Sequence, residues 1–472
     1  MKPTRQAEFA RILGLWDAAA IVAGSMIGSG IFLVSADIAR LLDAPVWLLA
    51  VWLATAAVTV VAALNYGELA AMLPRAGGQY VYLREAYGPL WGFLYGWTLF
   101  TVIQTGTIAA VAVAFAKFCA VFIPALEGST AGSVGLDGQR CVAIGVIVLL
   151  TWANCRGLRT GRWIQNIFTV AKVGTLLAVV LAGVVLGPSL GQGHVNWVYF
   201  WGQRAMSLSD VLPLFGAAMV GALFSADAWN NITFAAAEVK HPERNIAASL
   251  VIGAGGVTVL YILANASYLA VLPLWGAAGG SNPLERGIQY ANNDRVASAM
   301  MEVLFGSTGN LLMSAAIMVS TFGCANGLIL SGARVYHAMA KDGLFFKAAG
   351  YLNVYRVPVV ALVFQAAWAG ILVLSGTYGD LLDYVIFAAL LFYSLTVAAV
   401  VVLRIRHPQW PRPYRAIGYP WLTLLYVAAT LAIMVDLLVM KPRYTWPGLL
   451  IVLAGVPVYY LTRQRRRASS LT

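Results

Sequence analysis

The chain has 472 residues, of which 60% are hydrophobic and 11% are charged, and its formal net charge is +12. Soluble globular domains average about 25% charged residues, so this composition excludes an ordinary soluble domain. Apolar runs of about 20 residues recur along the chain, and runs of that length mark transmembrane helices. We therefore expect an all-α polytopic membrane protein embedded in the lipid bilayer. No small-residue cleavage pattern follows the first run, so we expect no cleavable signal peptide.

Twelve apolar segments are predicted to cross the membrane. They lie at residues 14–35, 45–72, 90–124, 140–156, 163–187, 209–238, 245–271, 297–338, 358–376, 381–404, 418–440 and 445–462. An even number of spans places both termini on the same side, and that side carries 22 of the 31 Lys and Arg residues, against seven on the other. Cytoplasmic loops are enriched in Lys and Arg. We therefore expect both termini to be cytoplasmic in a multi-pass protein of the cell membrane, in particular a bacterial inner membrane.

The positive charge is thus explained by topology, and no nucleic-acid partner is expected. The tail Arg463-Gln-Arg-Arg-Arg467 is typical of a helix anchor against anionic lipid. The four cysteines (Cys119, Cys141, Cys155 and Cys324) lie in or next to predicted helices without CxxC spacing. They predict no metal site, no disulfide framework and no covalently linked subunit. No HExxH, GxSxG or phosphate-binding loop appears, so neither an enzyme nor a cofactor is expected.

The first segment is interrupted by Gly24-Ser-Met-Ile-Gly-Ser-Gly30. Gly24-x-x-x-Gly28 alone is typical of close helix packing in membranes. The added sequence Gly28-Ser29-Gly30 weakens a helix strongly, so we predict that the helix opens at the membrane midplane. The first N–H groups of its outer half would then lack intrahelical partners, which is costly in hydrocarbon unless they face a cavity or a ligand. Together with the helix dipole, these groups suit a carboxylate.

The sixth segment is interrupted by Phe224-Ser-Ala-Asp-Ala-Trp229, followed by Asn230 and Asn231. So many polar residues at mid-span are too costly for lipid exposure. A polar face packed inside the bundle is the alternative, but it still leaves Asp227 needing a partner. We predict a second break, with unpaired carbonyl groups around residues 23–26 and 223–225 that suit an ammonium. Donors for an anion close to acceptors for a cation describe a zwitterion site, which favours an α-amino acid.

Lys172 is the most informative charge within a helix, because it lies about ten residues into the fifth segment. A lysine at that depth is expensive and usually marks a functional site in the bundle interior. The alternative is that Lys172 reaches the membrane surface along its flexible side chain. If buried, its ammonium can occupy a cation site that would otherwise need a metal ion. Lys117 lies nearer a helix end, and the sequence assigns no role to Lys117, His337 or Asp436.

The two interruptions occupy matching positions if the chain contains two repeats of five helices. Paired interrupted segments in corresponding positions are the best sequence indication of a transporter's midplane site. The expected divisions are an N-terminal tail (1–12), the first repeat (13–187), the second repeat (209–404), two further helices (418–462) and a basic tail (463–472). With an odd number of helices in each repeat, the second repeat is inverted in the membrane.

Several motifs in this order resemble the amino acid–polyamine–organocation (APC) superfamily. They are Gly24-Ser-Met-Ile-Gly-Ser-Gly-Ile-Phe32, Pro74-Arg-Ala-Gly-Gly-Gln-Tyr80, the Phe-Thr-x-Ala-Lys172 segment and Phe224-Ser-Ala-Asp-Ala-Trp-Asn230. The segment Glu238-Val-Lys-His-Pro-Glu-Arg-Asn-Ile246 resembles the branch of L-type amino acid transporters and their bacterial relatives. The resemblance covers most of residues 10–410. It implies a LeuT-like fold of twelve helices with five-plus-five inverted repeats, and transport by alternating access.

The resemblance also implies roles for individual residues. Gly28, Ser29 and Gly30 would bind the substrate carboxylate, whereas Met26 and the backbone of Phe224 and Asp227 would lie near the amino group. Phe224 would also gate the site from outside. The expected substrate-binding set is completed by two neighbours, Ile27 and Ser225.

Lys172 matches the lysine that sodium-independent members carry where sodium-coupled relatives bind an ion. Two positions depart from the family pattern, because Ala228 replaces a glycine before the tryptophan and Ala247 replaces a proline. The first departure leaves the unwinding of the sixth helix open.

The expected function is sodium-independent transport of neutral L-amino acids, by exchange or by proton symport. One alternative is a permease for cationic amino acids or polyamines, in which Asp227 attracts the second positive charge. The other is a membrane receptor that binds amino acids without moving them.

Overall fold

The computed structural model describes residues 11–126, 137–156, 158–203, 207–355 and 357–469. About 80% of the described residues are helical, and within these ranges the extended pairing consists of one isolated bridge between Leu13 and Val239. Most of the predicted N-terminal tail and the last three residues of the basic tail lie outside the described residues. The predicted all-α fold is confirmed.

The first five predicted spans are represented by eight helices. The first span is divided into three helices, and the third contains a π-helical turn. The helices are α1 (Leu15–Met26), α2 (Gly30–Leu33), α3 (Ser35–Leu42), α4 (Pro45–Met72), α6 (Pro89–Thr98), α7 (Gln104–Cys119), α8 (Gly138–Cys155) and α9 (Leu158–Leu190), with the π-turn η1 (Leu99–Ile103) between α6 and α7. Short connecting elements are α5 (Gln79–Tyr87), η2 (Pro124–Leu126) and α10 (His194–Val198).

The remaining spans begin with a second divided helix. They are α11 (Leu208–Ser225) with α12 (Asn231–Phe234) and η3 (Ala236–Glu238), α13 (Pro242–Val271), α15 (Val296–Lys341), α16 (Val359–Ser375), α17 (Tyr378–Arg406), α18 (Trp421–Met440) and α19 (Pro442–Ser469). The connectors are α14 (Pro283–Arg286), η4 (Asn292–Asp294) and η5 (Lys347–Gly350). Within α15, Gly306 has a φ of +64°, so the predicted span 297–338 combines a short helix with the long helix that follows the turn.

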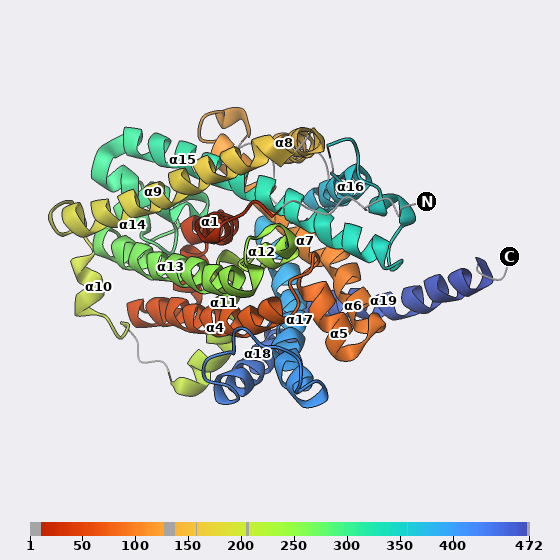
Figure 1. The fold of residues 1–472 in the computed structure, drawn as a ribbon. Coiled ribbons are helices and arrows are strands. Elements are labelled where there is room, and N and C mark those ends of the chain that lie inside the picture. Colours follow the sequence, from red (N-terminus) through yellow and green to blue (C-terminus); the bar gives the residue numbers. More distant parts are fainter. Residues whose placement is uncertain (1–10, 127–136, 157, 204–206, 356, 470–472) are drawn as a thin grey trace.

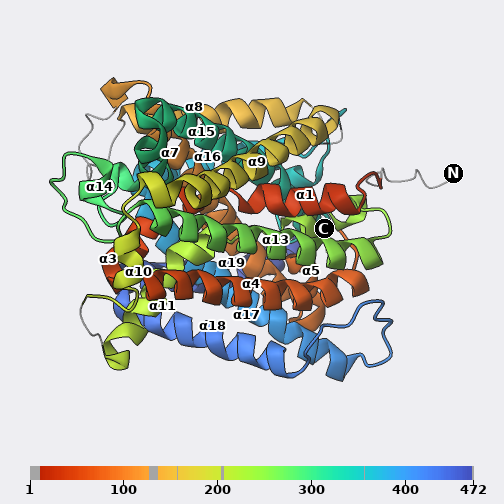
Figure 2. The ribbon, with the colours of Figure 1, turned by 90° about the vertical axis from the view of Figure 1, so that its left-hand side faces the viewer.

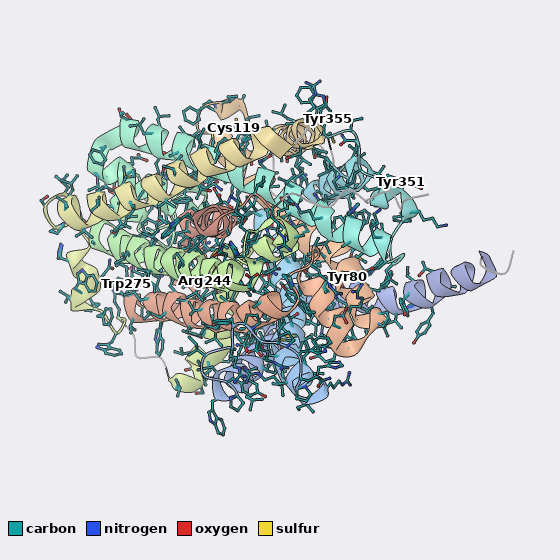
Figure 3. The ribbon with its side chains drawn as sticks, in the orientation of Figure 1. Tyr80, Cys119, Arg244, Trp275, Tyr351 and Tyr355 are labelled. Atoms are coloured by element: carbon teal, nitrogen blue, oxygen red, sulfur yellow. The ribbon has the colours of Figure 1, made fainter. Side chains whose placement is uncertain are left out.

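The lengths and hydropathies of these helices fit a membrane protein. Among the described residues, ten helices are long and apolar enough to cross a bilayer, and α1 and α16 are shorter apolar helices. Figures 1 and 2 show the long helices side by side, with α10 and α14 at one end of the bundle and α5 at the other. We call these the α14 end and the α5 end; Figure 3 labels Trp275 at the first and Tyr80 at the second.

Ion pairs between distant segments close the α5 end. Glu68 of α4 accepts two hydrogen bonds from Arg404 of α17, at 2.9 and 2.6 Å, and lies 3.5 Å from Arg412. Glu238 accepts two from Arg334 of α15, at 2.8 and 3.1 Å. All four pairing groups are mostly buried, and breaking one partner of a buried pair is strongly destabilising. The pairs therefore join both broken and unbroken helices at this end.

Candidate functional site

The first helix is broken where its sequence is richest in glycine. α1 ends at Met26 and α2 begins at Gly30, and Ile27 between them is extended, with φ −71° and ψ 92°. Within the described residues, the N–H groups of Gly28 and Ser29 make no backbone hydrogen bond. Residues 26–30, from the last residue of α1 to the first of α2, are all buried. The break therefore leaves hydrogen-bond donors inside the bundle, as the glycine pattern predicts.

The sixth helix is broken at Ala228. α11 ends at Ser225 and α12 begins at Asn231, and Ala228 has a φ of +62°. This left-handed conformation costs a residue with a side chain about 1–2 kcal/mol. The sequence left open whether the sixth helix unwinds with alanine in place of glycine at position 228. The structure shows that it does, despite the methyl group. The Asp227 N–H donates to the Phe224 carbonyl at 3.1 Å, which closes the end of α11.

The two breaks touch each other directly. A Cβ atom added at Gly30 would lie 2.1 Å from Ser225 Oγ and 3.0 Å from Ser225 Cα. Ser225 Oγ is itself fixed, because it donates to the Gly221 carbonyl at 2.7 Å. Only glycine at position 30 lets the two half-helices approach this closely, which gives the third glycine of the motif a specific function.

The broken end of α1 is surrounded by side-chain donors from neighbouring helices. They are Lys172 Nζ (to Gly24 O, 2.7 Å), Cys324 Sγ (to Ser25 O, 3.2 Å), Tyr261 OH (to Met26 O, 3.0 Å) and Ser320 Oγ (to Ile27 O, 3.3 Å, and Gly28 O, 3.4 Å). The Ala23 carbonyl accepts from the Ile27 N–H.

The prediction that the carbonyls at residues 23–26 are unpaired is therefore wrong. It is also wrong for Phe224 and Ser225, whose carbonyls accept from the Asp227 N–H and from the Tyr261 hydroxyl. An unpaired carbonyl in an apolar interior is costly, so the fold supplies partners from other helices. Each carbonyl oxygen has a second lone pair, however, and can still accept a hydrogen bond from an ammonium.

Lys172 lies in the interior, as predicted from its depth in the fifth segment. Its side chain is only 1% exposed, and its Nζ reaches from α9 to the Gly24 carbonyl. Among the described residues it forms no ion pair with a carboxylate. Its positive charge therefore faces the negative end of the α1 dipole.

Tyr261 of α13 forms hydrogen bonds to both breaks. It was not identified as a site residue from the sequence. Its hydroxyl lies 3.0 Å from the Met26 carbonyl of α1 and 3.0 Å from the Ser225 carbonyl of α11. A single hydroxyl proton is thus shared between the ends of both half-helices. A tyrosine in the middle of an otherwise apolar span was the available sequence signal, because a buried hydroxyl needs a partner.

Two aromatic residues cover the breaks on the side of the α14 end. The rings of Phe224 and Tyr378 are edge to face, with centroids 6.1 Å apart, and the Tyr378 hydroxyl lies 3.0 Å from Ser29 Oγ. Lys117 Nζ is 5.9 Å from the centre of the Tyr378 ring. Tyr378 was also missed, because its position at the start of α17 shows no pattern in the sequence.

A charged network lies beyond Tyr378 at the α14 end. Asp294 is 2.9 Å from Arg40 of α3 and 3.8 Å from Lys117, and Arg40 also pairs with Asp37. Lys117 therefore lies at the helix end, where its charge has a partially exposed partner. The network connects α3, the continuation of the first broken helix, to the segment before α15.

Toward the α5 end, Asp227 faces a second aromatic group. Its carboxylate accepts a hydrogen bond of 2.5 Å from the Tyr393 hydroxyl, and the rings of Tyr66, Trp229 and Tyr393 pack edge to face or tilted beside it. The cavity next to Asp227 has a volume of about 20 Å³, which is room for about one water molecule. Binding a molecule the size of an amino acid therefore requires the surrounding helices to move.

Two adjacent breaks in a bundle of apolar helices, with donors and a buried cation at the break of α1, define a polytopic membrane transporter. Comparison with known proteins identifies the family. Residues 13–458 match the amino acid permease family, and the chain belongs to it. It is an amino acid transporter of the APC superfamily.

The most similar proteins include two human transporters. The b(0,+)-type amino acid transporter 1 is 29% identical over 460 residues, which cover 95% of this chain and 87% of the relative. The large neutral amino acids transporter small subunit 2 is 30% identical over 455 residues, which cover 95% and 80%. Its counterpart from Rattus norvegicus is 30% identical over 451 residues, with the same coverage.

Proposed function

We propose that the chain is a sodium-independent transporter of neutral L-amino acids that works by alternating access, either as an exchanger or as a proton symporter. The contact between Lys172 Nζ and the Gly24 carbonyl supports this proposal most strongly. A fixed ammonium at the carbonyl end of α1 supplies the positive charge that a bound sodium ion would supply. A transporter with such a residue does not need sodium to complete its site.

The proposed substrate site lies between the two breaks. The N–H groups of Gly28, Ser29 and Gly30 would bind the substrate carboxylate, and the carbonyls of Met26 and Phe224 would accept from its ammonium. Ile27, Ser225 and the Asp227 backbone complete the proposed set. The large neutral amino acids named for two relatives support a neutral substrate class. Phe224 would close this site toward the α14 end, assisted by Tyr378.

A cationic substrate is the second candidate, and Asp227 is the observation that favours it. Its buried carboxylate accepts from a neutral hydroxyl and, among the described residues, pairs with no cation. A second positive charge on the substrate would compensate this carboxylate. A polyamine would satisfy it in the same way, whereas a receptor that does not transport would bind substrate without flux.

We also propose an orientation and a subunit composition. The 22 Lys and Arg residues on the side of the termini support a cytoplasmic α5 end, in a bacterial inner membrane. Residues 13–187 and 209–404 would form the two inverted repeats. We propose transport without a covalently linked subunit, because the four cysteines lie within or at the ends of helices and not in a long loop.

Counterflow in proteoliposomes tests the function directly. Vesicles of purified protein, preloaded with one unlabelled neutral amino acid, should accumulate the labelled amino acid equally in sodium and in choline buffers. Accumulation that needs no pH gradient identifies exchange, and uptake driven by an inward proton gradient in empty vesicles identifies symport. Strict dependence on sodium would contradict the role given to Lys172. Binding of the amino acid without any flux would show a receptor.

A further inference from the structure

A lateral groove of about 580 Å³ lies between α11 and α18. Figure 2 shows α18 along one edge of the bundle with α11 next to it. The groove is lined by Pro213, Leu431, Ala432, Val435, Asp436, Val439 and Met440. Three of its apolar side chains, Leu431, Val435 and Val439, are 48–72% exposed. Because both helices are apolar membrane spans, the groove opens toward lipid.

Asp436 is the one charged group in this apolar lining. Its Oδ2 atom is buried and has no hydrogen-bond partner among the described residues, and Asp436 forms no ion pair there. The carboxylate packs against α11 at Gly216, where an added Cβ would lie 2.1 Å from Oδ2. The side chain as a whole is half-buried, at the contact between α11 and α18 beside the groove. An acidic side chain within a membrane span that lacks a partner is costly and usually has a function.

The position of Asp436 along α18 fits the level of lipid headgroups. It lies four residues before the end of α18 at Met440, which corresponds to about 6 Å at a rise of about 1.5 Å per residue. The nearest following cation, Lys441, donates to Asp383 at 2.7 Å and is thus already paired. Within the described residues, no cation of the chain pairs with Asp436, which leaves its carboxylate available to a cationic ligand.

We infer that this groove binds a phospholipid with a primary ammonium headgroup, namely phosphatidylethanolamine. The carboxylate suits a group that combines a positive charge with hydrogen-bond donors, and a primary ammonium has three donors. The trimethylammonium of phosphatidylcholine carries the same charge but cannot donate. The volume lies within the range of about 300–1,000 Å³ of small-molecule sites, and the exposed Leu431 and Val435 suit the acyl chain. A phosphatidylethanolamine molecule supplies both an ammonium for Asp436 and an acyl chain for the apolar lining of the groove.

Lipid-resolved native mass spectrometry of the full-length protein in detergent tests this inference. The protein is titrated with phosphatidylethanolamine or phosphatidylcholine of identical acyl chains, and thermal stability is measured in parallel. We expect at least threefold tighter binding of phosphatidylethanolamine to the wild type. Asp436→Asn, which keeps the shape and removes the charge, should abolish this preference. Asp210→Asn is the matched control, because Asp210 lies on α11, the helix that packs against α18 at the groove, but is exposed and accepts a hydrogen bond from Ser207, and it should keep the preference.

A second variant keeps the inference testable if Asp436→Asn does not fold. Val435→Trp fills the groove while keeping the carboxylate, so it should weaken the binding of both lipids. Equal affinity of the wild type for the two lipids would overturn the inference, and so would an unchanged preference in Asp436→Asn. A wild-type dimer that forms without lipid and dissociates in Val435→Trp would assign the groove to a second copy of the chain instead. The outcome does not depend on which amino acid is transported.

Discussion

Gly30→Ala tests the contact between the two breaks, which is the central geometric feature of the proposed site. The new Cβ would lie 2.1 Å from Ser225 Oγ, 2.8 Å from Ser225 Cβ and 3.0 Å from Ser225 Cα. Rotation of the hydroxyl relieves the first contact only. Ordinary contacts begin at 3.4 Å, so the half-helices must separate by about 0.6 Å to relieve the second.

The size of the effect follows from this overlap. Forcing a methyl group into a well-packed interior costs about 1–3 kcal/mol. If the cost falls on the conformation in which the breaks touch, the population of that conformation drops by about 5- to 150-fold. We therefore expect a large loss of counterflow activity at saturating substrate, with a smaller loss of thermal stability.

Counterflow and thermal unfolding, measured on the same preparations, check this prediction. Gly174→Ala is the matched control, since a Cβ at that glycine of α9 would meet nothing within 4 Å, and it should transport like the wild type. The double variant Gly30→Ala with Ser225→Gly removes two of the three overlapping atoms and should recover part of the activity. Wild-type activity in Gly30→Ala alone would refute the close contact of the breaks.

Three further substitutions address single contacts. Lys172→Met removes a charge-assisted hydrogen bond and should lower sodium-independent counterflow at least about tenfold, and full activity would contradict its proposed role. Tyr378→Phe keeps the ring contact with Phe224 but removes the hydroxyl that bonds to Ser29. Ser29 then no longer has to leave this partner before substrate binds, so KM for substrate added from the α14 side should fall by about two- to tenfold. An unchanged KM would exclude Tyr378 from the gate. Asp227→Asn should retain neutral substrates within about threefold, whereas selective loss of lysine or arginine uptake would favour the cationic alternative.

The positions of the helices were predictable from the sequence because bilayer thickness sets the length of an apolar span. The two breaks were predictable for a related reason, since glycine and intramembrane polar residues are tolerated only where the backbone is buried in protein or faces a cavity. The depth of Lys172 indicated an interior position by the same argument. The turn at Gly306 was not predicted, because the hydropathy of residues 297–338 is continuous across it.

What the sequence determined by itself is the local chemistry: where the helices run, where they break, and that a lysine lies deep within the fifth span. What only the tertiary structure decided is which groups meet across helices. The carbonyls at the end of α1 and in the break after it accept from Lys172, Cys324, Tyr261 and Ser320, which belong to three different helices. The physical reason is that hydropathy and helix-breaking residues act over one or two turns of a single segment, whereas these hydrogen bonds join residues that are 148 to 299 positions apart.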